Sequence, residues 1–153
     1  MYKNPIPVVV GLICDTQNRV LIIQRKIEPH IGGWALPGGY VEEGDDWRVA
    51  LQKELLQEAL IEVSATPARM KLLDVASTPD TKRILIFAKV GAPGILKTRR
   101  FLSTDETLKR EWLAFDQRKN IKLCFSLHQK VLDAHWKNVQ QKEARESRFN
   151  HSW

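Results

Sequence analysis

The chain has 153 residues, of which 43% are hydrophobic and 27% are charged, and its formal net charge is +6. This length and composition fit a single globular domain. The first residues lack the charged leader and apolar core of a signal peptide, and no apolar run is long enough to cross a bilayer. We therefore expect a cytoplasmic protein without a membrane partner.

The composition also disfavours two kinds of partner. Cys14 and Cys124 are far apart and each lies among apolar residues, which argues against a zinc site built from Cys-x-x-Cys pairs. The basic residues are scattered and not interleaved with aromatic residues. Nucleic acid is therefore not the expected partner, although the net charge is positive.

The first half of the chain predicts a hairpin, a loop and a helix. Residues 6–13 and 19–25 are rich in Val, Ile and Leu, and the turn signal DTQN between them predicts that they pair as a hairpin. Glycine and proline in GGWALPGG, residues 32–39, predict a loop. The helix that follows is expected to begin at an N-cap on Asp45 or Asp46 and to end at Ile61 or Glu62.

The second half predicts three more strands and a closing helix. Residues 71–77 and 83–90 are joined by the turn signal TPDT, and residues 111–115 are a short strand candidate. From Ser126 onward, apolar residues recur at helical spacing, which predicts an amphipathic helix. The polar residues 141–153 are expected to form either the end of this helix or a disordered tail.

This order of elements favours an α/β protein of the α+β kind, in which helices pack on a mixed sheet. Strands and helices do not alternate regularly, as they do in a Rossmann sheet or an α/β barrel. Neither a Gly-x-Gly-x-x-Gly nor a Gly-x4-Gly-Lys-Ser/Thr loop is present. We therefore expect one domain over residues 1–140, followed by the polar tail over residues 141–153.

Residues 38–62, GGYVEEGDDWRVALQKELLQEALIE, carry the clearest chemistry. An acidic cluster follows the glycine turn, and Glu54 and Glu58 then lie four residues apart on the helix, so their side chains share one face. That face is otherwise largely apolar, and two carboxylates on it need a positive partner. A hard divalent cation with oxygen ligands would provide one. The alternative is a solvated acidic helix face, and the helix alone does not decide between the two.

The same segment resembles the Nudix box, whose pattern is G-x5-E-x7-R-E-U-x-E-E-x-G-U, with U a bulky aliphatic residue. The residues that match the pattern are Gly39, Glu54, Leu55, Glu58 and Ile61. The flanking WALPGG and VEEG are similar to segments that often accompany the box. The positions that depart from it are Asp45 for the first Glu, Lys53 for Arg, Gln57 for Glu and Leu60 for the last Gly.

The resemblance implies the Nudix fold, a mixed β-sheet sandwiched between helices, and a metal-dependent, MutT-like hydrolase. The implied substrate is a nucleoside diphosphate linked to another moiety, and the implied cofactor is Mg²⁺ or Mn²⁺. Residues 4–11, NPIPVVVG, are similar to a branch that often carries an N-terminal zinc ribbon, which this chain lacks. Relatives in that branch act on ADP-ribose, FAD or NADH-like dinucleotides. A homodimer is also implied, because such domains often dimerise.

The catalytic residues implied by the resemblance are Glu54, Glu58, Lys53 and Glu106. The implied metal site consists of Glu54, Glu58, Gln57 and Gly38. Lys53 would steady the acidic cluster. Glu106 would serve as a distal ligand or base, and a surface carboxylate is the equally weighted alternative.

The implied substrate contacts are Arg25, Trp34, Gly38 and Gly39. Arg25 would meet a phosphate, and Trp34 would stack on a base. A surface charge at the strand end and a core anchor are the respective alternatives, since most Trp residues serve packing.

Gln57 is the departure with the largest consequence for function. A neutral amide oxygen binds a cation more weakly than a carboxylate does. The alternative function is therefore a catalytically weak Nudix module that binds or senses a nucleotide.

Overall fold

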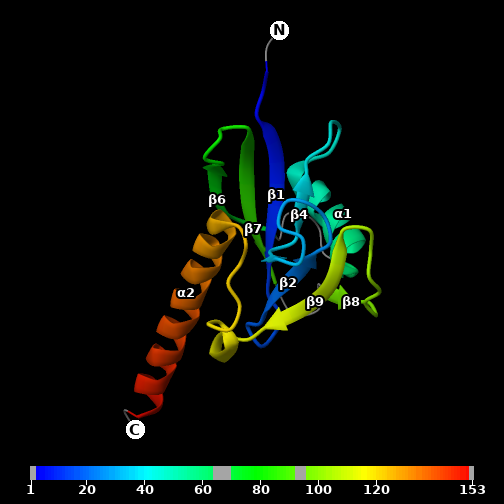
Figure 1. Ribbon diagram of the computed structural model, residues 1–153. Helices are drawn as coiled ribbons and strands as arrows, with labels where there is room; N and C mark the ends of the chain where they lie inside the picture. The colour runs from blue at the N-terminus through cyan, green and yellow to red at the C-terminus, as the bar shows by residue number, and fades with distance from the viewer. Residues whose placement is uncertain (1–2, 64–69, 92–95, 152–153) are drawn as a thin grey trace.

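The computed structural model describes residues 3–63, 70–91 and 96–151. Its elements (Figure 1) in chain order are β1 (Ile6–Ile13), β2 (Val20–Arg25), β3 (Trp34–Ala35), β4 (Gly38–Tyr40), α1 (Trp47–Ala59), β5 (Ile61–Val63), β6 (Lys71–Ser77), β7 (Arg83–Val90), β8 (Leu96–Thr98), β9 (Thr107–Leu113), a 3-10 turn (Phe115–Gln117) and α2 (Ser126–Asn150). The strands at residues 6–13, 71–77 and 83–90 have the bounds predicted from the sequence.

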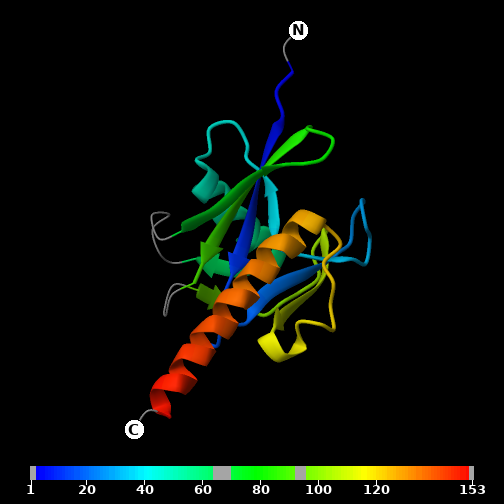
Figure 2. The same cartoon turned by 90° about the vertical axis from the view of Figure 1, so that its left-hand side faces the viewer.

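Two helices cover opposite sides of the central strands (Figures 1 and 2). In the four-stranded sheet, of order β4-β1-β7-β6, β1 and β7 run parallel, while β4 and β6 are antiparallel to their neighbours. A three-stranded sheet, β3-β2-β9, and a two-stranded sheet, β5-β8, complete the strands. The expected α+β architecture, a mixed sheet between helices, is confirmed.

Alternating side chains of β1 and β2 build one hydrophobic core on each side. Val9 of β1 and Leu21 of β2 belong to the core under α1, whereas Val10 and Ile22 belong to the core under α2. Because both faces of these strands are buried, their sequences are continuously apolar and show no alternation with polar residues.

The hairpin predicted for the first two strands is wrong. β1 lies between β4 and β7, whereas β2 lies between β3 and β9, and an isolated bridge from Cys14 to Val20 connects the two segments. The turn itself is present, because the Asp15 carboxylate accepts the backbone N–H groups of Gln17 and Arg19 at 3.0 and 2.9 Å. Strands that are apolar on both faces give no sign of which neighbour they will pair with.

Helix α1 begins where predicted and ends earlier. The Asp46 carboxylate caps its first turn by accepting a backbone N–H at 2.9 Å. At the other end, Leu60 has a φ of 53°, in the left-handed region, and the helix ends at Ala59. The predicted end at Ile61 or Glu62 is therefore wrong, because those two residues belong to β5.

Of the two later elements, the strand differs from the prediction and the helix agrees with it. The strand expected at residues 111–115 is β9, which starts at Thr107 because it pairs with β2 along most of its length. Helix α2 begins at Ser126 as predicted and continues to Asn150, and residues 140–150 are all exposed. Within the described residues, no helix combines the length and apolar character needed to span a membrane.

Candidate metal centre

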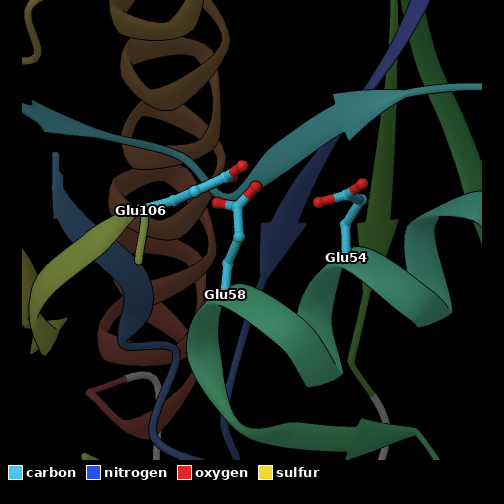
Figure 3. Close-up of side chains that lie close together, drawn as sticks. All are labelled: Glu54, Glu58 and Glu106. Carbon is cyan, nitrogen blue, oxygen red and sulfur yellow. The ribbon is translucent and has the colours of Figure 1, made fainter. Parts of the chain in front are cut away.

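Three carboxylates converge beside α1. Glu54 and Glu58 project from successive turns of the helix, and Glu106 reaches them from the position just before β9 (Figure 3). One carboxylate oxygen of each residue lies within 4.8 Å of the other two. The structure therefore brings together the three acidic residues that the sequence and the family resemblance single out.

The position of Glu106 depends on the loop that leads into β9. The Thr104 hydroxyl oxygen accepts the backbone N–H groups of Glu106 at 3.3 Å and Thr107 at 3.0 Å. On the other side, the Glu106 carbonyl accepts the Lys26 N–H at 2.9 Å, at the end of β2. A register irregularity in the β2–β9 pair next to Arg25 accompanies this turn. Sequence reasoning assigned no role to Thr104.

The two glycines of β4 are required by what lies against them. A Cβ at Gly38 would overlap the carbonyl oxygen of Val9 on the neighbouring strand β1. A Cβ at Gly39 would overlap the carboxyl group of Glu54. The segment predicted as a loop therefore contains a short strand that has no side chains where it passes β1 and the carboxylate cluster.

The carboxylates of α1 are held in an environment that disfavours their charge. The pKa of Glu58 is raised from 4.5 to about 9, first by burial, then by its hydrogen bond with Glu54 and by the charges of Glu54 and Glu106, while Arg25 opposes the rise. Burial also raises the pKa of Glu54. Without a cation, Glu58 is therefore protonated, and its carboxyl O–H donates a hydrogen bond to the Glu54 carboxylate. Three close oxygen donors with this need for positive charge fit a hard divalent cation.

Lys53 contacts the acidic loop that precedes α1. Its Nζ donates to both carboxylate oxygens of Asp45, at 2.9 and 3.0 Å. Gln57 is exposed and lies next to the buried Glu58. The two departures from the box therefore differ in kind: Lys53 keeps an ionic partner, whereas Gln57 adds no charge beside the cluster.

Arg25 lies near the cluster but is tied to its own loop. Its Nε donates to the Pro29 carbonyl at 2.7 Å and its Nη2 to the Glu28 carbonyl at 3.3 Å. The guanidinium also lies 5.1 Å from the centre of the Phe125 ring. Its positive charge still acts on Glu58, where it partly opposes the rise in pKa that burial causes. Trp34 is partly buried and packs against the core under α2, as the core-anchor alternative predicts.

His128 of α2 forms a hydrogen bond with the backbone of the glycine-rich segment. Its Nδ1 accepts the backbone N–H of Leu36 at 3.2 Å, two residues before Gly38. Burial lowers the pKa of His128 to about 4, so the ring is neutral at pH 7 and can accept this bond. The His128 side chain is buried. Its contact with Leu36 has no signal in the local pattern.

Residues 4–134 match the family model described as the NUDIX domain. The chain belongs to the NUDIX family. An ADP-ribose pyrophosphatase from Methanocaldococcus jannaschii is 32% identical over 147 residues, which cover 90% of this chain and 78% of that protein. An 8-oxo-dGTP diphosphatase from Proteus vulgaris is 40% identical over 65 residues. That match covers 42% of this NUDIX chain and 58% of the Proteus protein.

Solved structures agree with the NUDIX fold. A NUDIX hydrolase from Nitrosomonas europaea superposes with a TM-score of 0.76 at 22% identity, over 92% of this chain and 75% of that one. The NUDIX domain of Shewanella oneidensis NrtR, complexed with ADP ribose, gives a TM-score of 0.68 at 16% identity, over 90% of each chain. At these identities the likeness concerns the fold alone.

Proposed function

We propose that this NUDIX protein is a metal-dependent hydrolase that cleaves the pyrophosphate linkage of a nucleoside diphosphate joined to another moiety. The observation that carries the proposal is the convergence of Glu54, Glu58 and Glu106 within 4.8 Å. Keeping three ionised carboxylates together, one of them 6% exposed, costs free energy unless a cation, or a proton on Glu58, offsets their charge. The family match and the pyrophosphatase and diphosphatase names of two relatives support the same reaction.

In this proposal the chain's own groups have distinct tasks. Glu54, Glu58 and Glu106 would hold Mg²⁺ or Mn²⁺, and the Gly38 carbonyl and the Gln57 amide would be further oxygen donors. Such an ion would offset the charge of the substrate phosphates and lower the pKa of a bound water. Glu106, the exposed member of the cluster, would accept a proton from the attacking water.

Two other residues serve the substrate in this proposal. Arg25 would turn its guanidinium, now held by the carbonyls of Glu28 and Pro29, toward a phosphate. Gly39 has no side chain, so the Glu54 carboxyl group can lie against its backbone, where the substrate would approach. Positioning and electrostatics would supply most of the catalysis, as in other phosphoryl transfers.

The proposed substrate class is ADP-ribose or a related dinucleotide such as FAD or NADH. The Methanocaldococcus relative is named an ADP-ribose pyrophosphatase, and its match covers most of both chains. The Shewanella NUDIX domain, similar in fold, was crystallised with ADP ribose. The Proteus relative points instead to an oxidised nucleoside triphosphate, so both classes enter the test.

A second candidate function, a NUDIX module that binds or senses a nucleotide with little turnover, is favoured by Gln57. This residue stands where the box has a glutamate, and it leaves the site one carboxylate short. An amide oxygen gives the cation a dipole in place of a full charge. Under this candidate the protein would bind the nucleotide and release little product.

The test measures phosphate released, after coupling to a phosphatase, from ADP-ribose, FAD, NADH, dinucleoside polyphosphates and 8-oxo-dGTP, with Mg²⁺ and with Mn²⁺. Wild type is compared with Glu58→Gln, Gln57→Glu and the control Glu143→Gln, which removes an exposed carboxylate on α2. Turnover that is lost in Glu58→Gln and kept in Glu143→Gln would support the hydrolase. Turnover in Gln57→Glu alone would support the binding module.

A further inference from the structure

Arg110 extends from β9 toward the helix that carries the carboxylates. In the β2–β9 pair it lies opposite Ile23, and residues opposite each other in a sheet point to the same face. Ile23 belongs to the core under α1. The Arg110 side chain on β9 therefore lies on the face of the sheet that α1 covers.

The guanidinium of Arg110 binds the C-terminal end of α1. Its Nη1 donates to the carbonyl of Ala59 at 2.7 Å and to that of Leu60 at 3.4 Å. Its Nη2 donates to the carbonyl of Arg99 at 3.0 Å. The guanidinium carbon lies 5.4 Å from the centre of the Phe101 ring. This planar group thus joins the end of the helix, the segment after β8 and the strand β9.

The end of α1 needs such a partner because of its sequence. The last carbonyls of a helix find no N–H donor within the helix, and they carry partial negative charge. Glycine after the last turn, or a basic residue within it, commonly compensates. Here Leu60 stands at the glycine position of the box with a φ of 53°, and the last turn of α1 has no basic residue. Arg110 supplies the missing cation from outside the helix.

The hydrogen bonds of Arg110 also join the two elements that carry the carboxylate cluster. Glu54 and Glu58 belong to α1, whereas Glu106 precedes β9, so the cluster holds together only if α1 and β9 keep their relative position. Arg110 is on β9 and binds the carbonyl of Ala59, the residue that follows Glu58. We propose that Arg110 is a positioning residue, which fixes the last turn of α1 against β9 and thereby sets Glu58 at the distance from Glu106 that a cation needs.

The kinetic part of this inference rests on the proposed hydrolase, but cation binding tests it separately. The affinity for Mn²⁺ alone is measured by electron paramagnetic resonance for wild type, Arg110→Met and Arg110→Lys, together with kcat, KM and Tm. The matched control is Arg118→Met. Arg118 also donates to a backbone carbonyl, that of Phe115 at 2.9 Å, and covers the Phe115 ring at 3.8 Å, but it does not belong to β9 or α1.

We expect Arg110→Met to weaken Mn²⁺ binding by about tenfold, as the loss of a group that orients metal ligands does. The kcat should fall while the KM for the nucleotide changes little. Arg110→Lys should lie between the two, because an ammonium group cannot span several carbonyls as the planar fork does. Arg118→Met should lower Tm and leave Mn²⁺ affinity unchanged.

A lower Tm in Arg110→Met with wild-type Mn²⁺ affinity would overturn the proposal and leave Arg110 a purely structural residue. If Arg110→Met does not fold, Arg110→Lys decides: weaker Mn²⁺ binding supports the proposal, and wild-type affinity overturns it. If wild type turns over none of the nucleotides, a loss of Mn²⁺ affinity in Arg110→Met still supports the positioning role. That result would contradict only the proposed hydrolase.

Discussion

The Nζ of Lys53 lies 2.9 Å and 3.0 Å from the two carboxylate oxygens of Asp45. The NUDIX box has Arg and Glu at these positions, so both residues of the pair are replaced here by smaller ones of the same charge. The two side chains thus keep the charges of the box pattern and form an ion pair with each other. The Asp45 side chain is 17% exposed and that of Lys53 is 56% exposed, so the contact joins the acidic loop to α1 from the solvent side.

Breaking the Lys53–Asp45 ion pair should cost little stability, and the losses of the two single variants should not add in the double variant. Asp45→Asn and Lys53→Gln are each expected to lower the free energy of unfolding by about 0.5 kcal/mol, because water screens a pair that is partly exposed. The double variant should lose no more than the larger single variant, since the second substitution removes a charge that already has no partner. Urea unfolding of the four proteins measures this. Fully additive losses would contradict the coupling.

Gly39→Ala should damage the site without unfolding the protein. Its Cβ would overlap the Glu54 carboxyl group and force that side chain away from Glu58. We expect kcat to fall about 100-fold, the effect of a misplacement on the order of 1 Å. Gly32→Ala is the control, because Gly32 has a φ of 82° but a Cβ there meets nothing within 4 Å. That variant should lose stability and keep kcat per folded molecule. Equal kcat values in the two variants would refute this role of Gly39.

The stability of the metal-free protein should fall as the pH rises. The pKa of Glu58 is about 9 in the folded protein and 4.5 when the group is unperturbed, so the folded state binds the extra proton. The contribution of this proton to the free energy of unfolding is complete below pH 4.5 and is lost as the pH rises through 9. One such proton gives a slope of at most about 1.4 kcal/mol per pH unit.

Urea unfolding in EDTA across this pH range measures the slope. Glu58→Gln should flatten it, because the amide does not titrate. Saturating Mn²⁺ should flatten or reverse the slope, because the cation binds the deprotonated carboxylate and so takes over from the proton. A slope in EDTA that is the same in wild type and Glu58→Gln would show that other groups cause it.

Thr104→Val should weaken cation binding through Glu106. The valine keeps the shape of the side chain but removes the oxygen that accepts the N–H groups of Glu106 and Thr107. We expect about a tenfold loss of Mn²⁺ affinity. Thr78→Val is matched to it, because the Thr78 hydroxyl accepts the Arg83 N–H at 3.2 Å in the turn between β6 and β7. Comparable losses of affinity in both variants would point to a general loss of structure.

The elements of this fold could be predicted from the sequence more completely than their pairing. Runs of Val, Ile and Leu bounded by turn signals define β1, β6 and β7. The same runs conceal the topology, because Val9 and Val10 are equally apolar and face different cores. Nothing in β1 indicates that it pairs with β7, far away in the chain. The start of β9, Thr107 to Lys109, is too polar for a strand by pattern and forms one by pairing with β2.

The site shows the same division between local and tertiary information. Helical spacing predicts that Glu54 and Glu58 share a face, and the box singles out Gly39. The convergence of Glu106 required the family resemblance, because its place depends on the β2–β9 register. The contacts of Arg110 with the end of α1 depend on that register too. Only the absence of glycine at Leu60 hinted that the helix end needs an external partner.

The proposed cation site has a consequence for synthesis of the chain, because one of its three residues depends on the pairing of β9 with β2. Helix α1 leaves the ribosome carrying Glu54 and Glu58, but Glu106 follows 48 residues after Glu58. The third carboxylate reaches the others only when β9 has paired with β2. If the three carboxylates hold a cation as proposed, its binding would be coupled to the pairing of β9 with β2, and the ion would stabilise the completed chain more than a nascent one. A chain arrested before residue 106 would carry Glu54 and Glu58 without Glu106, and would have less affinity for the proposed metal.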